Sequence, residues 1–281
     1  MSDWSDATAP SGQRFVFAES GVGPAVVFLH GFPDTPHGWD HIAEAVSAAG
    51  YRTIRPWLRG YHPDTLVAGR GYDALTTAHD PVLLLDALGI DRAVLVGHDW
   101  GAGMTYGASS VAPERFRAIV PIAIPHPSLL PRDPRTLWGA RHFAGFKMPW
   151  AEAMTRRSNF AYLDSLYRRW APNWSGPVRD ECLRNVKECF REPSSLTAAI
   201  DYYRALSPKA PRELARPADV RTLVVGGTDD IVPTALFAKT AERMGDGSES
   251  LVIERAGHWP HREGEDEFIA GLIGFLAATP A

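Results

Sequence analysis

Short apolar runs alternate with amphipathic stretches along the first 126 residues of the chain. The runs at 25–29 and 93–96 contain no polar residue, which is typical of strands buried on both faces of a sheet. Between such runs, apolar residues recur at helical spacing, and glycines stand where glycine commonly ends a helix. Strands that alternate with helices in this way indicate a mostly parallel α/β sheet. The predicted strands lie at 13–18, 25–30, 52–56, 93–96 and 117–124, and the predicted helices at 39–49, 74–88 and about 100–111.

The alternation stops at residue 127 and resumes near residue 222. Between these points Arg, Trp, Tyr and Leu recur at helical spacings, and prolines separate short helical segments. We therefore predict an α/β core domain made of residues 1–126 and 216–281, with a helical domain of residues 127–215 inserted between its two parts. The resumed pattern predicts strands at 222–225 and 250–255 and helices at 235–244 and 265–278.

Composition and charge exclude several classes of protein. Hydrophobic residues make up 45% of the chain and charged residues 22%, which is typical of a folded globular protein. The formal net charge of −4 argues against a partner such as nucleic acid or an anionic membrane. The apolar runs are too short to span a bilayer, and segment 1–6 has no features of a secretory signal. Cys182 and Cys189 are too far apart on one predicted helix to form a disulfide. We expect a cytoplasmic monomer or homodimer.

An aspartate flanked by glycines follows the predicted strand at 93–96. In the segment Gly97-His98-Asp99-Trp100-Gly101, small residues two before and two after Asp99 allow a sharp turn from strand into helix. The turn exposes the Asp99 side chain at the carboxyl edge of the sheet, beside a helix N-terminus that stabilises anions. A carboxylate in this place attacks an sp³ carbon and forms an alkyl ester that is then hydrolysed. We therefore predict that Asp99 is a nucleophile rather than only a helix N-cap.

Other segments supply the partners that such a nucleophile needs. The loop after the second predicted strand places the backbone N–H of Phe32 where it would form an oxyanion hole with that of Trp100. Asp229 and Asp230 follow the strand at 222–225, and either is suited to orient a histidine. His258 follows the last predicted strand, 28 residues beyond Asp230. These positions predict a triad of nucleophile, acid and histidine.

The motifs resemble the α/β-hydrolase superfamily and, within it, the epoxide hydrolases. The order of nucleophile, acid and histidine is the one found in α/β-hydrolases. The resemblance extends from about residue 13 to residue 278 and implies an α/β-hydrolase fold with residues 127–215 as its helical cap. The loop Arg59-Gly60-Tyr61 belongs to the resemblance and is interpreted as structural. The other segments that carry it are His30–Asp34, Gly97–Gly101 and Ile124–Pro127.

The resemblance implies an epoxide hydrolase mechanism without a cofactor or a metal. Asp99 would open the epoxide and His258 would activate the water that hydrolyses the ester. Asp230 is preferred as the triad acid, because family members usually place it three residues after the glycine that ends the strand, here Gly227. Asp229 stays possible, since Gly226 also ends that strand.

An epoxide hydrolase also needs cap residues that donate a proton to the ring oxygen. Asp201-Tyr202-Tyr203 resembles the second cap tyrosine motif of the family and assigns Tyr203 as a donor, because a phenol is neutral at pH 7. The first cap tyrosine of the family falls at or near His142. Either His142 donates in its place, or Tyr162 or Tyr167 serves.

The inserted segment is rich in aromatic residues, which predicts an apolar pocket for a small apolar epoxide. His37 and His41 lack a third ligand for a metal site. His261 is expected to face solvent at the start of the last helix. The predicted pocket residues are Phe32, Trp100, Trp138, Phe143, Trp150, Tyr162 and Tyr167.

Two related classes and one non-catalytic class stay open as alternatives. Haloalkane dehalogenases also have Trp after the aspartate, but they often place Asn where this chain has Phe32. Haloacetate dehalogenases use arginines one and four residues after the nucleophile, where this chain has Trp100 and Gly103. A histidine at the position of His142 is also found in haloacetate dehalogenases. A receptor that only binds a small ligand is a further alternative.

Overall fold

A mostly parallel sheet of eight strands forms the centre of the computed structural model, which describes residues 4–67, 71–129, 141–207, 211–214 and 216–280. The strand order is β1-β2-β4-β3-β5-β6-β7-β8; β1 and β2 are antiparallel to their neighbours and the others are parallel. The predicted fold class is confirmed. The strands are β1 Ser5–Thr8, β2 Arg14–Ser20, β3 Ala25–Leu29, β4 Arg52–Pro56, β5 Ala93–His98, β6 Phe116–Ile122, β7 Leu223–Gly227 and β8 Glu249–Ile253.

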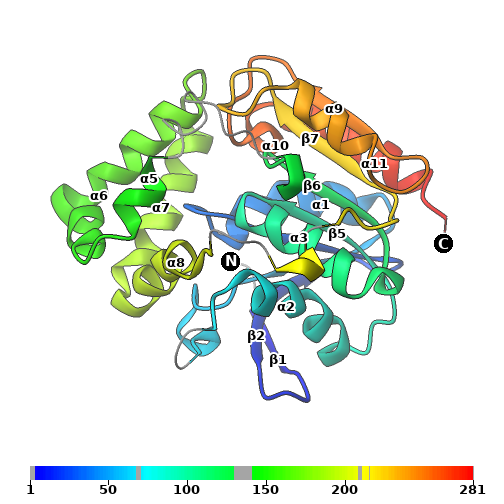
Figure 1. Ribbon diagram of the computed structural model, residues 1–281, viewed down its shortest axis with the longest axis horizontal. Coiled ribbons are helices and arrows are strands. Elements are labelled where there is room, and N and C mark those ends of the chain that lie inside the picture. The colour runs from blue at the N-terminus through cyan, green and yellow to red at the C-terminus, as the bar shows by residue number, and fades with distance from the viewer. Residues whose placement is uncertain (1–3, 68–70, 130–140, 208–210, 215, 281) are drawn as a thin grey trace.

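Helices cover both faces of this sheet (Figure 1). Alternate residues of the central strands face opposite sides, so Phe28 packs in one cluster with α1 and α11, whereas Leu29 packs in another with α2 and α3. Both faces are therefore buried, as the unbroken apolar runs predict. The helices of the core are α1 Asp40–Ala48, α2 Ala74–Ala87, α3 Trp100–Val111, α9 Ala235–Ala241, α10 Pro260–Glu263 and α11 Glu265–Ala277, with short 3₁₀ helices η1 Pro36–Trp39, η2 Pro63–Thr65 and η3 Pro113–Arg115.

The ends of some elements differ from the sequence prediction. Strand β6 ends two residues early because Ala123 adopts a φ of 67°, which turns the chain out of the sheet. Helix α9 ends at Ala241, and the next residues form tighter turns in which the N–H of Met244 bonds to the carbonyl of Ala241. The short exposed edge strand β1 was not predicted, because it contains no apolar alternation.

The described residues between β6 and β7 form helices and no strand. They are η4 Pro127–Leu129, α5 His142–Phe146, α6 Ala151–Trp170, α7 Pro177–Arg191, α8 Pro193–Ala205 and η5 Arg212–Leu214. In Figure 1, α5 to α8 gather beside the carboxyl edge of the sheet and apart from the helices that cover its faces. Helix α6 is interrupted at 157–160, where three successive residues have positive φ.

Helices α6 and α8 contact loops that follow parallel strands. The Tyr167 hydroxyl donates to the carbonyl of Pro33 over 2.8 Å, and the Tyr202 hydroxyl donates to the carbonyl of Arg59 over 3.0 Å. A Cβ atom on Gly60 would lie 2.4 Å from the Cβ of Ala198, so the loop after β4 needs a glycine there. The carboxyl edge of the sheet is thus covered by these helices. Within the described residues, no helix combines the length and the hydropathy needed to cross a bilayer.

Candidate active site

Asp99 occupies the turn between β5 and α3. Its backbone has a φ of 52°, in the region that residues with a side chain rarely adopt. A Cβ on Gly97 would lie 2.2 Å from the carbonyl oxygen of Gly101, and one on Gly101 would lie 2.3 Å from that of Leu29. The two glycines are therefore required for the sharp turn that the sequence predicts, and the turn directs the carboxylate toward the helices above the sheet edge.

A backbone N–H group donates to the Asp99 carboxylate. The N–H of Phe32 donates to Asp99 Oδ1 over 2.9 Å. Trp100 is the first residue of α3, so its N–H has no acceptor within the helix. His30 holds the Phe32 loop: its Nδ1–H donates to the carbonyl of Gly31 over 3.0 Å, and its Nε2 accepts from the N–H of Leu58 over 3.1 Å. Asp99 Oδ1 thus lies where donors would stabilise an oxyanion.

His258 lies between two carboxylates. Its Nε2 is 3.3 Å from Asp99 Oδ2, and its Nδ1 is 3.2 Å from Asp230 Oδ2. The Asp230 side chain is fully buried and also accepts the N–H of Ile231 over 2.6 Å. Asp229 points elsewhere and accepts from the side-chain amide of Asn173. The structure therefore brings together Asp99, Asp230 and His258, and leaves Asp229 outside the group.

These contacts determine the charges of the site. Burial alone would lower the pKa of His258, but the charges and hydrogen bonds of Asp230 and Asp99 raise it to about 10. Burial would likewise raise the pKa of Asp99, but its partners, His258 first, hold it below the ordinary value. Asp99 is thus an anion beside a histidine that carries a proton at neutral pH.

Tyr203 lies above the sheet edge inside a cluster of aromatic rings. Its ring centroid is 5.2 Å from that of Phe32 and 4.9 Å from that of Trp100. On the other side it contacts Phe143 at 5.0 Å and Phe146 at 4.7 Å. Burial, with the nearby charge of Asp99, raises the pKa of the Tyr203 phenol well above its ordinary value. The phenol therefore keeps its proton and can donate it.

The three candidates for a second donor lie in different surroundings. His142 is buried, with its ring 5.8 Å from Tyr203 and 4.6 Å from Trp170. Tyr167 uses its hydroxyl on the carbonyl of Pro33, and its ring packs against Trp259 at 4.2 Å. The half-buried Tyr162 lies beside the guanidinium of Arg169. Of these candidates, His142 is the one described above with its ring against that of Tyr203.

Three of the seven predicted pocket residues contact Tyr203: Phe32, Trp100 and Phe143. Trp150 directly precedes α6, and its side chain is turned to solvent with 61% of its surface exposed. It therefore does not line an enclosed pocket. Trp138 lies outside the described residues.

Trp170, at the end of α6, is a neighbour of the site that sequence analysis missed. Its carbonyl accepts the backbone N–H of His258 over 2.8 Å, and its ring lies 5.3 Å from the His258 ring. It also contacts His142. The chain offers no local signal for this role, since a tryptophan that ends a helix is ordinarily a packing residue.

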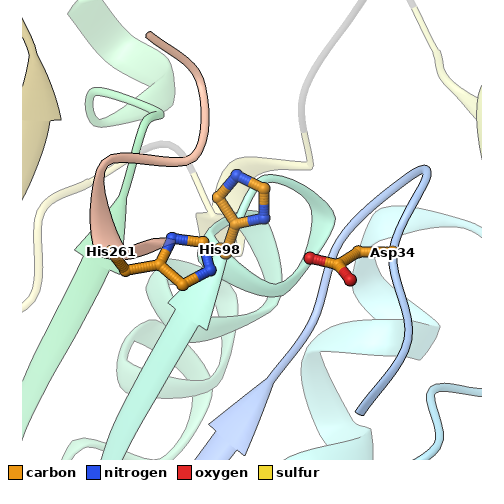
Figure 2. A group of neighbouring side chains, drawn as sticks. All are labelled: Asp34, His98 and His261. Atoms are coloured by element: carbon orange, nitrogen blue, oxygen red, sulfur yellow. The ribbon is translucent and has the colours of Figure 1, made fainter. Parts of the chain in front are cut away.

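The expectation that His261 faces solvent is wrong. Its side chain is fully buried, because α10 turns its first residues inward under the His258 loop and the His261 ring stacks on Trp39 at 4.5 Å. His261 instead lies close to Asp34 and His98: potential ligand atoms of the three are within 4.8 Å of one another (Figure 2). In the part of the chain that the structure describes, this is the group whose side chains come closest to a metal-ligand set, and it does not include His37 or His41.

Comparisons with known proteins identify the family. Residues 24–265 match the family model described as alpha/beta hydrolase fold. An epoxide hydrolase of Caballeronia sordidicola is 31% identical, over 97% of this chain and 93% of that protein. Epoxide hydrolase A of Mycobacterium tuberculosis is 28% identical, over 95% of each. A solved epoxide hydrolase from an endophytic Streptomyces is 25% identical with a TM-score of 0.82, over 98% of this chain and 95% of that one. The chain therefore belongs to the α/β-hydrolase superfamily and, within it, to the epoxide hydrolase family.

Proposed function

We propose that this enzyme opens an apolar epoxide to a vicinal diol through a covalent ester on Asp99. The observation that carries the proposal is the position of the Asp99 carboxylate, between the N–H of Phe32 and the ring of His258 at the foot of the ring cluster around Tyr203. An aspartate so placed is suited to displacement at carbon. Its relatives named epoxide hydrolases support the choice of substrate class.

In the first step, Asp99 Oδ2 attacks an epoxide carbon and the carbon–oxygen bond of the ring breaks. Oδ1 stays with the N–H of Phe32 and becomes the carbonyl oxygen of the ester. The Tyr203 phenol donates its proton to the ring oxygen as that oxygen gains charge, with His142 as the second donor. The phenolate regains a proton from solvent.

In the second step, water attacks the ester carbonyl carbon while His258 Nε2 takes a proton from it. The N–H groups of Phe32 and Trp100 stabilise the oxyanion on Oδ1. When this intermediate collapses, the diol oxygen leaves with the proton from His258, and Asp99 is free again. Asp230 orients the imidazole through Nδ1 and stabilises its charge.

The charge of Asp99 determines at which step His258 can act as a base. While Asp99 is ionised, it is one of two anions that raise the pKa of His258 to about 10, so the imidazole is protonated and unsuited as a base. Ester formation removes that charge, and the pKa of His258 falls because only Asp230 is left as an anionic partner. His258 then loses its proton to solvent and becomes a base when a base is needed.

The same proposal covers the organisation and setting of the chain. Residues 1–126 and 216–281 act as the catalytic core domain, and residues 127–215 act as the cap that supplies the proton donors. The unpaired thiols of Cys182 and Cys189 support a reducing, cytoplasmic setting. We expect a monomer or homodimer that binds no nucleic acid, in keeping with the net charge of −4.

The decisive experiment compares diol formation with halide release. We expect the enzyme to convert styrene oxide to its diol and to release no halide from 1-bromobutane; halide release without diol would favour a dehalogenase.

Asp99→Asn should abolish diol formation, because a neutral amide is a poor nucleophile. His258→Gln should form the ester and fail to hydrolyse it, so the Asp99 peptide gains the mass of the substrate. Saturable binding without turnover of either compound would instead indicate a receptor.

A further inference from the structure

A buried polar cluster lies directly behind the catalytic histidine. Asp34 comes from the loop after β3, His98 is the last residue of β5, and His261 belongs to α10. All three side chains are buried, and their polar atoms approach within 4.8 Å. Figure 2 shows the Asp34 carboxylate directed toward the His98 ring. The mechanism described above uses none of these three residues.

His98 connects the cluster to His258. Its Nε2 lies 2.7 Å from the backbone carbonyl oxygen of His258. A carbonyl only accepts hydrogen bonds, so His98 Nε2 must carry a proton. Burial lowers the pKa of His98 to about 3, so the ring is neutral and its Nδ1 is a bare lone pair. Among the described residues, Nδ1 has no hydrogen-bond partner.

Asp34 lies beside the His98 ring. Its Oδ1 accepts the backbone N–H of Thr35 over 2.8 Å. Burial raises the pKa of this carboxyl to about 6, against the opposing effects of the Thr35 N–H and of Arg262. The proton on His98 Nε2 is therefore assigned by the His258 carbonyl that it faces, and not by Asp34.

His261 and Arg262 complete the surroundings of the cluster. The His261 ring is also neutral, because burial and the charge of Arg262 hold its pKa well below the ordinary value. Three convergent lone pairs are a feature of metal sites. However, the buried Arg262 guanidinium already places a positive charge beside Asp34 and His261, and a divalent cation would be repelled by it. These surroundings argue against a divalent cation in the cluster.

We propose that His98 positions His258 by a hydrogen bond to its backbone carbonyl. Asp34 and His261 are buried beside the ring that makes this contact. The opposite side of the same residue is held from α6, where the His258 N–H donates to the carbonyl of Trp170 over 2.8 Å. The hydrogen bond from His98 is thus one of two backbone contacts that hold the imidazole between Asp99 and Asp230. This inference rests on the proposed role of His258 as the base.

The His98 contact should matter for one chemical step more than for the other. Attack by Asp99 needs an anion and a proton donor, and neither depends on the exact position of the imidazole. Ester hydrolysis needs His258 Nε2 to meet a water beside the ester, and a displacement of about 1 Å costs about 100-fold in such a step. A general loss of folding would instead slow both steps together.

The first experiment measures both steps by rapid quench with styrene oxide in the wild type, His98→Met and His98→Gln. We expect His98→Met to form the ester within about threefold of the wild-type rate and to hydrolyse it at least about tenfold more slowly, so that ester accumulates. His98→Gln should restore hydrolysis, because its amide can donate to the His258 carbonyl. Wild-type hydrolysis in His98→Met, equal loss of both steps, or no recovery in His98→Gln would overturn the proposal.

A second measurement does not require turnover. In enzyme labelled with ¹⁵N-histidine, long-range ¹⁵N–¹H spectra report which ring nitrogen carries a proton, with His98→Gln used to assign the signal. We expect His98 to be neutral with its proton on Nε2. A proton on Nδ1, or on both nitrogens, would overturn the inference even if styrene oxide were not a substrate. Absence of diol from the wild type would by contrast contradict the proposed function, and this measurement would then be the test of the His98 contact.

Discussion

The two sides of the site are held by different kinds of contact. On the sheet side, hydrogen bonds of 3.2 and 3.3 Å link His258 to Asp230 and Asp99. Backbone N–H groups also donate to the two carboxylates, over 2.6 Å to Asp230 and 2.9 Å to Asp99. On the helical side, Tyr203 and His142 are held by ring packing, at centroid distances between 4.6 and 5.8 Å. Hydrogen bonds fix one geometry, whereas packed rings allow several. The sheet side therefore suits the ester chemistry, and the helical side suits adjustment to a substrate.

The largest effect should come from breaking the sheet side at Asp230. Asp230→Asn removes the anion that orients His258, and an amide at that position favours the wrong tautomer of the imidazole. We expect ester hydrolysis to fall by about 10³- to 10⁴-fold while the ester still forms. The measurement is single-turnover kinetics followed by intact mass.

Asp229→Asn is the matched control for that variant. Asp229 lies one residue away and accepts from the Asn173 amide rather than from His258. We expect its ester hydrolysis to stay within about twofold of the wild type, since no group of the triad loses a charge. Comparable damage from both substitutions would mean that the strand end, and not the Asp230 carboxylate, carries the effect.

A smaller effect should come from the helical side at Tyr203. Tyr203→Phe keeps the ring that packs against Phe146 and removes the proton donor. We expect the rate of ester formation to fall about 100-fold, with ester hydrolysis unchanged. Rapid-quench kinetics separate the two steps, and a variant that slows hydrolysis instead would contradict the assignment of roles.

Tyr202→Phe serves as its control. The Tyr202 hydroxyl donates to the Arg59 carbonyl, so its loss removes a bond between α8 and the core. We expect unchanged kinetics and a free energy of unfolding lower by about 1 kcal/mol, measured by denaturant unfolding. Substitutions at these two adjacent residues of one helix would thus have different effects, one on catalysis and the other on stability.

The sheet side could be predicted from sequence because its geometry follows local rules. Gly97 and Gly101 are needed for a turn that no other residue permits, and that turn identifies Asp99 without reference to the rest of the molecule. The chain order of the acid and the histidine follows from the order of the strands. The residues alone left both Asp229 and Asp230 possible, and only the family resemblance favoured Asp230, because strand ends are uncertain by one residue and successive side chains face opposite ways.

The helical side was harder to predict because its geometry depends on packing between distant segments. A surface tryptophan and a buried tryptophan look alike in sequence, yet Trp150 is 61% exposed and Trp170 contacts His258. The sequence pattern predicts His261 in solvent at the start of the last helix, and only the tertiary fold buries it against Trp39. Composition indicated an aromatic cap but not which rings approach the nucleophile.

The smallest effect, and the sharpest test of the helical side, concerns His142. If His142 is the second donor, His142→Phe keeps a ring against Trp170 and Tyr203 but removes the N–H, and ester formation should fall by about tenfold. Tyr162→Phe should then have no more than a twofold effect, because that phenol lies beside Arg169. The opposite outcome would assign the donor to Tyr162 and would mean that α6 moves toward Asp99 when substrate binds. Because Tyr203 already supplies one proton, a second donor adds less than the first, which is why this loss should stay below that of Tyr203→Phe.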